Sequence, residues 1–93
     1  MRLKKFEIQA IKLTIEKYDK DAQIYLFGSR TDDTKRGGDI DLLIISNKID
    51  KRDIRKIKIE LYDLIGEQKI DIISTSKIKG AFIEYAYKSS IKL

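Results

Sequence analysis

The chain of 93 residues contains no cysteine and no histidine. The absence of cysteine excludes disulfides, thiolate zinc sites and a cysteine nucleophile. The absence of histidine removes the commonest general base and the commonest ligand of transition metals. Any acid–base chemistry in this protein must therefore use carboxylates, lysines or tyrosines.

Long apolar segments and several well-known nucleotide motifs are also missing. No apolar stretch approaches the length of a membrane span, and the start of the chain, 1–5, lacks the apolar core of a signal peptide. No Walker-type glycine-lysine loop and no dinucleotide-binding glycine fingerprint occurs. We therefore expect a cytoplasmic protein without a membrane partner, built as a single domain over 1–93.

Charge is abundant but mixed along the chain. Twenty basic and fifteen acidic residues leave a formal net charge of +5, and no block of five like charges occurs. This pattern is most often a solvated surface, and affinity for a nucleotide, a nucleic acid or an acidic partner is the alternative. A predicted helix also carries a basic flank, which is more often solvent-facing than a nucleic-acid surface; it comprises Lys51, Arg52, Arg55, Lys56 and Lys58.

Apolar periodicity predicts alternating helices and strands. Apolar residues at spacings of three and four predict a helix over 4–17, whose stripe is widened by Leu3, Phe6, Ala10 and Leu13 so that it lies across a sheet. The remaining expected elements are strands over 24–27 and 39–45, a helix capped by Asp50 or Asp53 and ended by Gly66, a strand over 69–74, a helix over 81–89 and a short strand over 91–93. The second helix presents Ile54, Ile57, Leu61, Leu64 and Ile65 on one face. The fold class is α/β (α+β), with helices packed on one layer of sheet.

The segment 24–45 carries the strongest functional signal. A short apolar strand leads into Gly28-Ser29-Arg30, and a polar loop then leads to Asp39 and Asp41 at the head of the next strand. Side chains two residues apart on a strand project from the same side, and two carboxylates that close repel each other unless a cation lies between them. Such oxygen ligands suit Mg²⁺, and a Gly-Ser turn offers backbone N–H groups and a hydroxyl to phosphate oxygens.

A further aspartate interrupts the apolar strand over 69–74. Ile70 and Ile72 face one way there, and Asp71 and Ile73 face the other. Because burying an unpaired carboxylate is costly, Asp71 needs a metal or a hydrogen-bonding partner. If this strand pairs beside 39–45, three carboxylates converge on one patch. The alternative is that Asp71 lies on a solvated face or at a sheet edge.

The pattern of these motifs resembles that of the polymerase-beta-like nucleotidyltransferase superfamily. It consists of Gly28-Ser29, Asp39-Ile40-Asp41 and the later Asp71. Within it, the small size is similar to the minimal nucleotidyltransferases, or MNT proteins. The resemblance covers nearly the whole chain and implies a small mixed sheet with helices packed on it. Two departures fall in the loop: Gly38 stands where many relatives carry serine, and Thr31-Asp32 follows Arg30 where many relatives have small residues and glycine.

The resemblance implies transfer of a nucleoside monophosphate from a nucleoside triphosphate, with ATP expected, to a hydroxyl, with release of pyrophosphate. By analogy, Asp39 and Asp41 bind two Mg²⁺ ions, with Mn²⁺ as the other candidate, and Asp71 binds the ion nearer the acceptor and takes the acceptor's proton. Gly28 and Ser29 hold the beta and gamma phosphates.

The loop between the two motifs contributes further candidates. Arg30 either neutralises phosphate charge or pairs with Asp32, Asp33 or another surface acid, two interpretations that the sequence leaves equal. Gly38, with Gly37, gives the loop freedom to approach the nucleotide. Lys35 and Arg36 are expected to be loop charges that can meet the triphosphate.

Minimal nucleotidyltransferases are commonly encoded beside a helical HEPN protein, with which they form toxin–antitoxin pairs. The resemblance therefore implies a HEPN partner that the chain neutralises, with addition of AMP to a tyrosine on that partner as the expected means. Two alternatives stay open: an antitoxin that acts by covering its partner without catalysis, and a nucleic-acid-binding module that uses the basic helix flank. The tyrosines at 62, 85 and 87 have helical spacing near apolar neighbours, which favours packing over stacking on a base.

Overall fold

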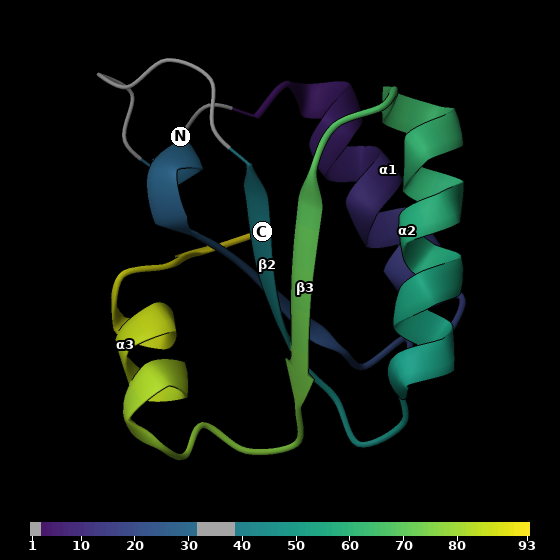
Figure 1. The fold of residues 1–93 in the computed structure, drawn as a ribbon. Coiled ribbons are helices and arrows are strands. Elements are labelled where there is room, and N and C mark those ends of the chain that lie inside the picture. The colour runs from purple at the N-terminus through teal and green to yellow at the C-terminus, as the bar shows by residue number, and fades with distance from the viewer. Residues whose placement is uncertain (1–2, 32–38) are drawn as a thin grey trace.

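Residues 3–31 and 39–93 are described by a computed structural model, shown in Figure 1. The elements in chain order are α1 (Lys5–Glu16), β1 (Gln23–Phe27), the 3-10 turn η1 (Gly28–Thr31), β2 (Ile40–Ile45), α2 (Lys51–Ile65), β3 (Ile70–Thr75), α3 (Ala81–Lys88) and β4 (Ile91–Lys92). Each helix and strand predicted from periodicity is present, with its ends shifted by no more than one residue. Within the described residues, no helix combines the length and the apolar character that crossing a membrane requires.

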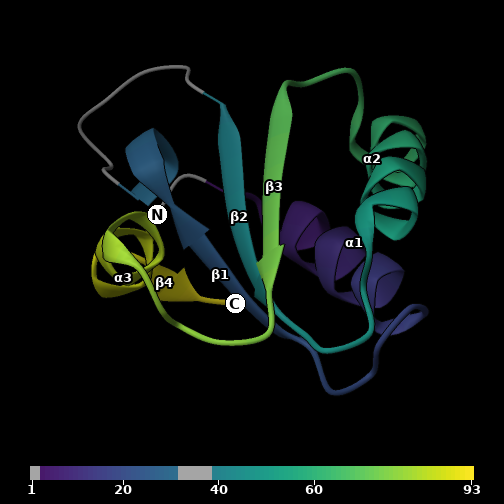
Figure 2. The same cartoon turned by 60° about the horizontal axis from the view of Figure 1, so that its bottom comes forward.

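The strands form one mixed sheet in the order β3-β2-β1-β4. β1 pairs antiparallel with both β2 and β4, whereas β2 and β3 run parallel. α1 and α2 cover one face of this sheet and α3 covers part of the other, as Figures 1 and 2 show. The α+β class expected from the sequence is therefore confirmed.

Strand alternation divides the core between the two faces. β2 is a central strand whose side chains are covered on both faces of the sheet, and Leu42, Leu43 and Ile44 have no exposed surface. Toward α1 and α2 the sheet contributes a group of buried aliphatic side chains, namely Ile24, Leu26, Ile40, Leu42, Ile44 and Ile70. Toward α3 the buried cluster is smaller and partly aromatic, and consists of Tyr25, Phe27, Leu43 and Ala86. Each fully buried aliphatic side chain contributes about 1.5–3 kcal/mol through the hydrophobic effect.

α2 shows how local sequence sets a helix in place. Asp50 caps its N-terminus by accepting a hydrogen bond from the Asp53 backbone N–H at 2.9 Å, and the Asp53 side chain accepts one from the Asp50 backbone N–H at 3.1 Å. Gly66 ends the helix with a φ of +90°, which glycine adopts without steric cost. Asp50 therefore provides the cap, and Asp53 completes the capping box.

The expectation that the helices bury wide apolar stripes was wrong at three positions. Phe6, Leu13 and Leu64 are 52%, 65% and 56% exposed. The apolar side chains that each helix buries fully form a narrower stripe, comprising Ile11 and Ile15 on α1 and Ile57, Leu61 and Ile65 on α2, with Ala10 and Ile54 partly buried against the same core. The three exposed side chains therefore stand on the outer sides of the helical layer.

Candidate functional site

The predicted acidic residues meet at one end of the sheet. Asp41 of β2 is the register partner of Asp71 in the parallel strand β3. On its other side, Asp41 is the register partner of Phe27, the last residue of β1. Residues that pair directly across strands share a face of the sheet, and this is the face that α3 partly covers. The parallel pairing therefore places Asp41 and Asp71 side by side, although 30 positions separate them in sequence.

The electrostatics of Asp41 reflect these neighbours. Burial raises its pKa, and the negative charges of Asp71 and then Asp39 raise it further, whereas the Lys69 ammonium lowers it. Asp41 is half-buried, and Asp71 is exposed. The negative charge of the Asp41 carboxylate is therefore unfavourable in this position, and a bound cation would stabilise it.

Both interpretations of Asp71 apply in part. β3 is an edge strand of the sheet, and the Asp71 side chain is exposed, as expected if this residue lies on a solvated face or at a sheet edge. The same side chain also lies on the face that carries Asp41, with Ile70 buried on the opposite face. An exposed position beside the half-buried Asp41 carboxylate leaves Asp71 accessible to a molecule approaching from solvent.

Gly28 links the turn to the carboxylates. It has a φ of +78°, a conformation that L side chains rarely adopt. A Cβ at this position would overlap Oδ2 of Asp41, so glycine is also required by space. Thr31 Oγ1 donates a hydrogen bond of 2.7 Å to the Gly28 carbonyl and closes the η1 turn. Only the backbone of Ser29 is described, and the predicted loop contacts of Lys35, Arg36, Gly37 and Gly38 lie outside the described residues.

Arg30 is held by a hydrogen-bonded chain that sequence reasoning missed. Its Nη2 donates to Gln68 Oε1 at 3.0 Å, and Gln68 Nε2 donates to Glu7 Oε2 at 2.9 Å and to the Ile65 carbonyl at 3.1 Å. Glu7 is only 5% exposed, and its Oε1 also accepts from the Lys4 backbone N–H at 2.9 Å. This chain joins η1, α1 and the loop between α2 and β3. A polar residue in a loop gives no sequence signal for a partner 38 or 61 positions away.

Lys69 is a second residue that the sequence analysis did not single out. Its Nζ lies 3.5 Å from Asp39 Oδ2, and both side chains are substantially exposed, at 70% and 42%. The backbone N–H of Ile40 also donates to the Lys69 carbonyl at 3.0 Å, which ties the start of β2 to the start of β3. The short loop before β3 thus provides Gln68, which hydrogen-bonds to Arg30, and Lys69, which pairs with the Asp39 carboxylate.

The donor set suits a hard divalent cation, since Asp39, Asp41 and Asp71 offer only carboxylate oxygens. As the side chains stand in the described part of the chain, no three acidic groups are gathered closely enough to hold a metal ion. The Asp39 carboxylate is instead turned toward Lys69. These side chains are at least partly exposed, so a change of rotamer can turn them toward a bound ion.

The fold and this acidic site define a class: an α+β domain with aspartates on two parallel neighbouring strands, beside a glycine turn. The family model described as "Polymerase beta, Nucleotidyltransferase" matches residues 9–93, and the chain belongs to this family. It therefore carries a nucleotidyltransferase domain, as the resemblance indicated. The comparison with curated proteins found no match.

Proposed function

We propose that this protein is a Mg²⁺-dependent nucleotidyltransferase that moves a nucleoside monophosphate, with AMP from ATP as the expected case, to a hydroxyl on a protein. The observation that carries the proposal is the pairing of Asp41 with Asp71 in adjacent parallel strands, next to a glycine whose Cβ position is taken by the Asp41 carboxylate. A surface that served only for docking has no need of a half-buried carboxylate whose pKa is raised by burial and by two neighbouring carboxylates.

In this proposal Asp39, Asp41 and Asp71 hold the Mg²⁺ ions. The ions supply charge neutralisation for the triphosphate and for the attacking oxygen. Asp71 is exposed on the edge strand and takes the proton of the acceptor hydroxyl, since the chain has no histidine. The acceptor oxygen then bonds to the alpha phosphorus, and the bond from that phosphorus to the bridging oxygen of the beta phosphate breaks. Pyrophosphate leaves with the electron pair of that bond.

The other side chains of the site bind and orient the donor. The backbone at Gly28 and Ser29 is proposed to hold the beta and gamma phosphates. Arg30 is proposed to neutralise phosphate charge, and the chain through Gln68 to the buried Glu7 supports this role because it limits the positions that the guanidinium can take. An arginine that served only as a surface ion pair has no need of such an anchor.

For the acceptor we propose a HEPN-type partner, with the chain acting as its antitoxin. The support for this step is the resemblance to minimal nucleotidyltransferases. A partner protein brings its own folded surface, so a small transferase domain is sufficient to position a tyrosine hydroxyl.

Label transfer tests the activity directly. The purified chain, Mg²⁺ and ATP labelled at the alpha phosphate are added to a lysate of the source cell, with the Asp39→Asn/Asp41→Asn double variant as the control. A labelled protein band that appears only with the parent chain is expected, and its mass identifies the acceptor. Absence of a band with all four labelled nucleoside triphosphates, from a folded parent chain, contradicts the proposal.

A binding antitoxin is the second candidate, and the exposed apolar side chains of the helical layer favour it. Phe6, Leu13 and Leu64 are each more than half exposed, so they are available to a partner protein that covers the helical layer. In this alternative, the Asp39→Asn/Asp41→Asn variant still neutralises the partner in cells, whereas Leu13→Lys fails. If the aspartate variant loses neutralisation and Leu13→Lys retains it, the binding alternative is excluded.

A further inference from the structure

An aromatic row runs from the acidic site to α3. Phe27, the register partner of Asp41, contacts Phe82 of α3 edge to face, with ring centroids 6.3 Å apart and an interplanar angle of 81°. Phe27 is 9% exposed, whereas Phe82 is 57% exposed. The outer ring therefore stands beside the site on the face that carries the carboxylates, with much of its surface open to solvent.

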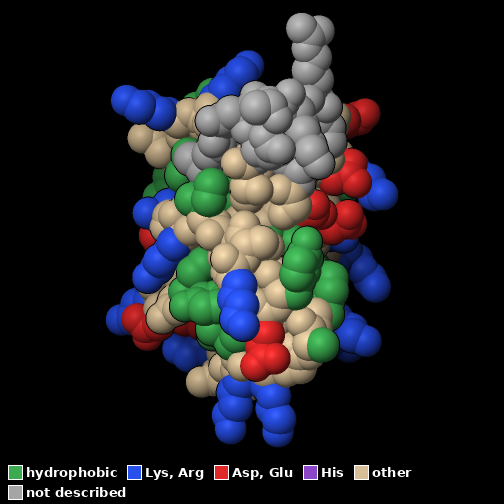
Figure 3. Space-filling model, turned by 90° about the vertical axis from the view of Figure 1, so that its left-hand side faces the viewer, with side chains coloured by type: hydrophobic (Ala, Val, Ile, Leu, Met, Phe, Trp, Pro, Cys, Tyr) green, Lys and Arg blue, Asp and Glu red, His purple; other side chains and the backbone are tan. Residues whose placement is uncertain are grey.

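Tyr85 extends this row on the same helix. It lies three positions after Phe82, a spacing that makes the two side chains neighbours on one side of α3, and it is 68% exposed. The expectation that this tyrosine is packed was therefore wrong, because the side of α3 that meets the sheet is occupied by Ala86 and Ile83. Figure 3 views the molecule from the side on which α3 lies, and hydrophobic side chains gather there on the surface.

We propose that Phe82, with Tyr85 beside it, forms the wall on which the base of the donor nucleotide stacks. This inference rests on the proposed nucleotidyltransferase function and adds the subsite that binds the base. Every base has a π-face, and stacking on an exposed aromatic ring is a recurrent way for proteins to hold bases. The carboxylates and Gly28 account for the phosphates and ions, so the nucleoside is the part of the donor that still needs a surface.

The placement favours the base over the acceptor as the occupant. Phe27 is followed directly by Gly28, so the strand that supports the aromatic row continues into the turn proposed for the beta and gamma phosphates. A nucleotide whose phosphates lie between this turn and Asp41 can place its nucleoside on the Phe27 side of Asp41, where it meets the rings. Asp71, which is proposed to take the acceptor's proton, lies on the other side of Asp41 from Phe27, on the exposed edge strand.

The test compares a probe that has a base with one that lacks it. The parent chain and Phe82→Ala are titrated calorimetrically with ATP and with tripolyphosphate, both in excess Mg²⁺. Loss of the ring is expected to weaken ATP binding about tenfold and to leave tripolyphosphate binding unchanged. Phe82→Leu keeps an apolar side chain but loses the aromatic face, and it is expected to weaken ATP almost as much as the alanine variant does.

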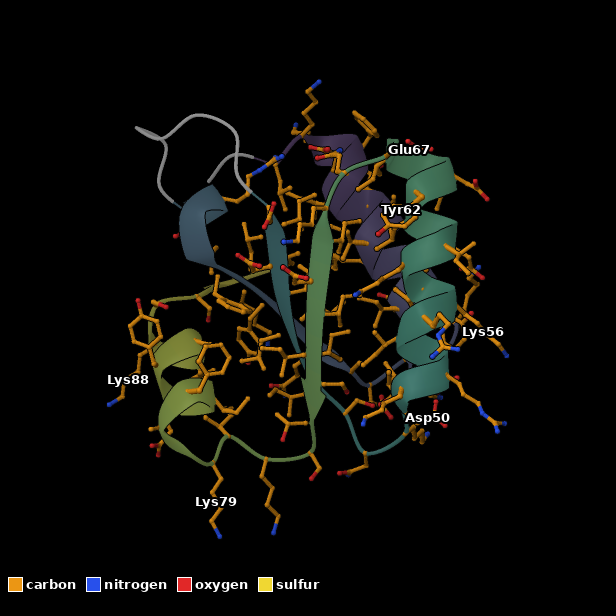
Figure 4. All side chains as sticks on the ribbon, viewed as in Figure 1. Asp50, Lys56, Tyr62, Glu67, Lys79 and Lys88 are labelled. Carbon is orange, nitrogen blue, oxygen red and sulfur yellow. The ribbon has the colours of Figure 1, made fainter. Side chains whose placement is uncertain are left out.

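A matched control uses an exposed aromatic residue elsewhere. Tyr62 is 38% exposed and lies on α2, which covers the opposite face of the sheet from α3, as Figure 4 shows. Tyr62→Ala should leave both affinities unchanged, and circular dichroism of each variant confirms that it is folded. Because Phe82 is more than half exposed and lies outside the buried core, its replacement is not expected to prevent folding.

The outcomes separate this inference from the function on which it rests. If the parent chain binds both probes and folded Phe82→Ala binds ATP as tightly as the parent, the base wall is wrong and the transferase proposal stands. If Phe82→Ala weakens both probes equally, the ring supports the phosphate site and does not bind the base. If the folded parent chain binds neither probe, the proposed function fails as well.

Discussion

Asp41 and Asp71 lie directly opposite each other in the parallel pair formed by β2 and β3. Two carboxylates in this position repel each other, and the repulsion together with burial raises the pKa of Asp41. The protein tolerates this unfavourable arrangement within a sheet whose strands are mostly apolar. Sites where like charges are held together against their repulsion are often sites where a cation or a reacting group belongs.

The first prediction concerns the stability of the metal-free protein. The pKa of Asp41 is higher in the folded than in the unfolded state, so losing its proton costs more free energy in the folded protein. The free energy of unfolding therefore falls as the pH rises from about 4, the unfolded pKa, through the folded pKa. Asp41→Asn removes this penalty. We expect its melting temperature in EDTA at pH 7 to exceed that of the parent by a few degrees, and the difference to shrink toward pH 3.

Magnesium should reverse this order. An ion that binds only the folded parent at 100 times its Kd adds about 2.7 kcal/mol to the free energy of unfolding, whereas Asp41→Asn loses a ligand and gains much less. Asp63→Asn, on the exposed side of α2, is the control and should behave as the parent in both conditions. A parent whose melting temperature does not respond to saturating Mg²⁺, with or without ATP, contradicts the metal site.

Gly28→Ala should abolish nucleotide transfer. The new Cβ meets Oδ2 of Asp41 and must displace that carboxylate, in addition to a backbone cost of about 1–2 kcal/mol at a φ of +78°. Gly66→Ala is a close control, because Gly66 has a φ of +90° but no atom within 4 Å of its Cβ position. Both variants should unfold at lower temperature, and only Gly28→Ala should lose activity in the label-transfer assay. Equal activity in the two variants would show that the approach to Asp41 is unimportant.

Gln68→Leu should raise the KM for ATP, and the same acceptor protein should be labelled as with the parent chain. The substitution removes the contact between Gln68 and Arg30 and leaves the buried Glu7 carboxylate with one partner fewer, at a cost of about 1–3 kcal/mol in stability. If Gln68 acts by positioning Arg30, then Gln68→Leu has little further effect on KM in an Arg30→Ala background. Additive effects of the two substitutions on KM would show that Gln68 contributes independently of the arginine.

Lys69→Met should tighten Mg²⁺ binding while changing the free energy of unfolding by less than about 1 kcal/mol. The Lys69–Asp39 pair is exposed, so its contribution to stability is small, but the ammonium competes with a metal ion for the Asp39 carboxylate. The affinity of each variant for Mg²⁺ is measured by calorimetry without nucleotide. Lys77→Met, at an exposed position after β3, is the control for the loss of one positive charge. Unchanged or weaker Mg²⁺ binding in Lys69→Met contradicts this competition.

The sequence alone determined the order and type of the elements and pointed to the carboxylates. Periodicity of two placed Ile70 and Ile72 opposite Asp71. The alternation held in the structure because the helices cover the two faces of the sheet unequally (Figure 2). The spacing of Asp39 and Asp41 could be interpreted for the same reason, since strand geometry is local. Gly66 and Asp50 could be assigned to helix ends because caps depend on a few adjacent residues.

The tertiary structure alone decided which distant residues meet. Packing between elements far apart in the chain sets the parallel register that brings Asp41 beside Asp71. The same packing lets Gln68 join Arg30 to Glu7 and brings Lys69 to Asp39. The exposure of Phe6, Leu13 and Leu64, against expectation, follows from the narrow stripe through which each helix meets the sheet. Apolar periodicity reports which side of a helix is apolar, whereas the area that another layer covers is set by the geometry of packing.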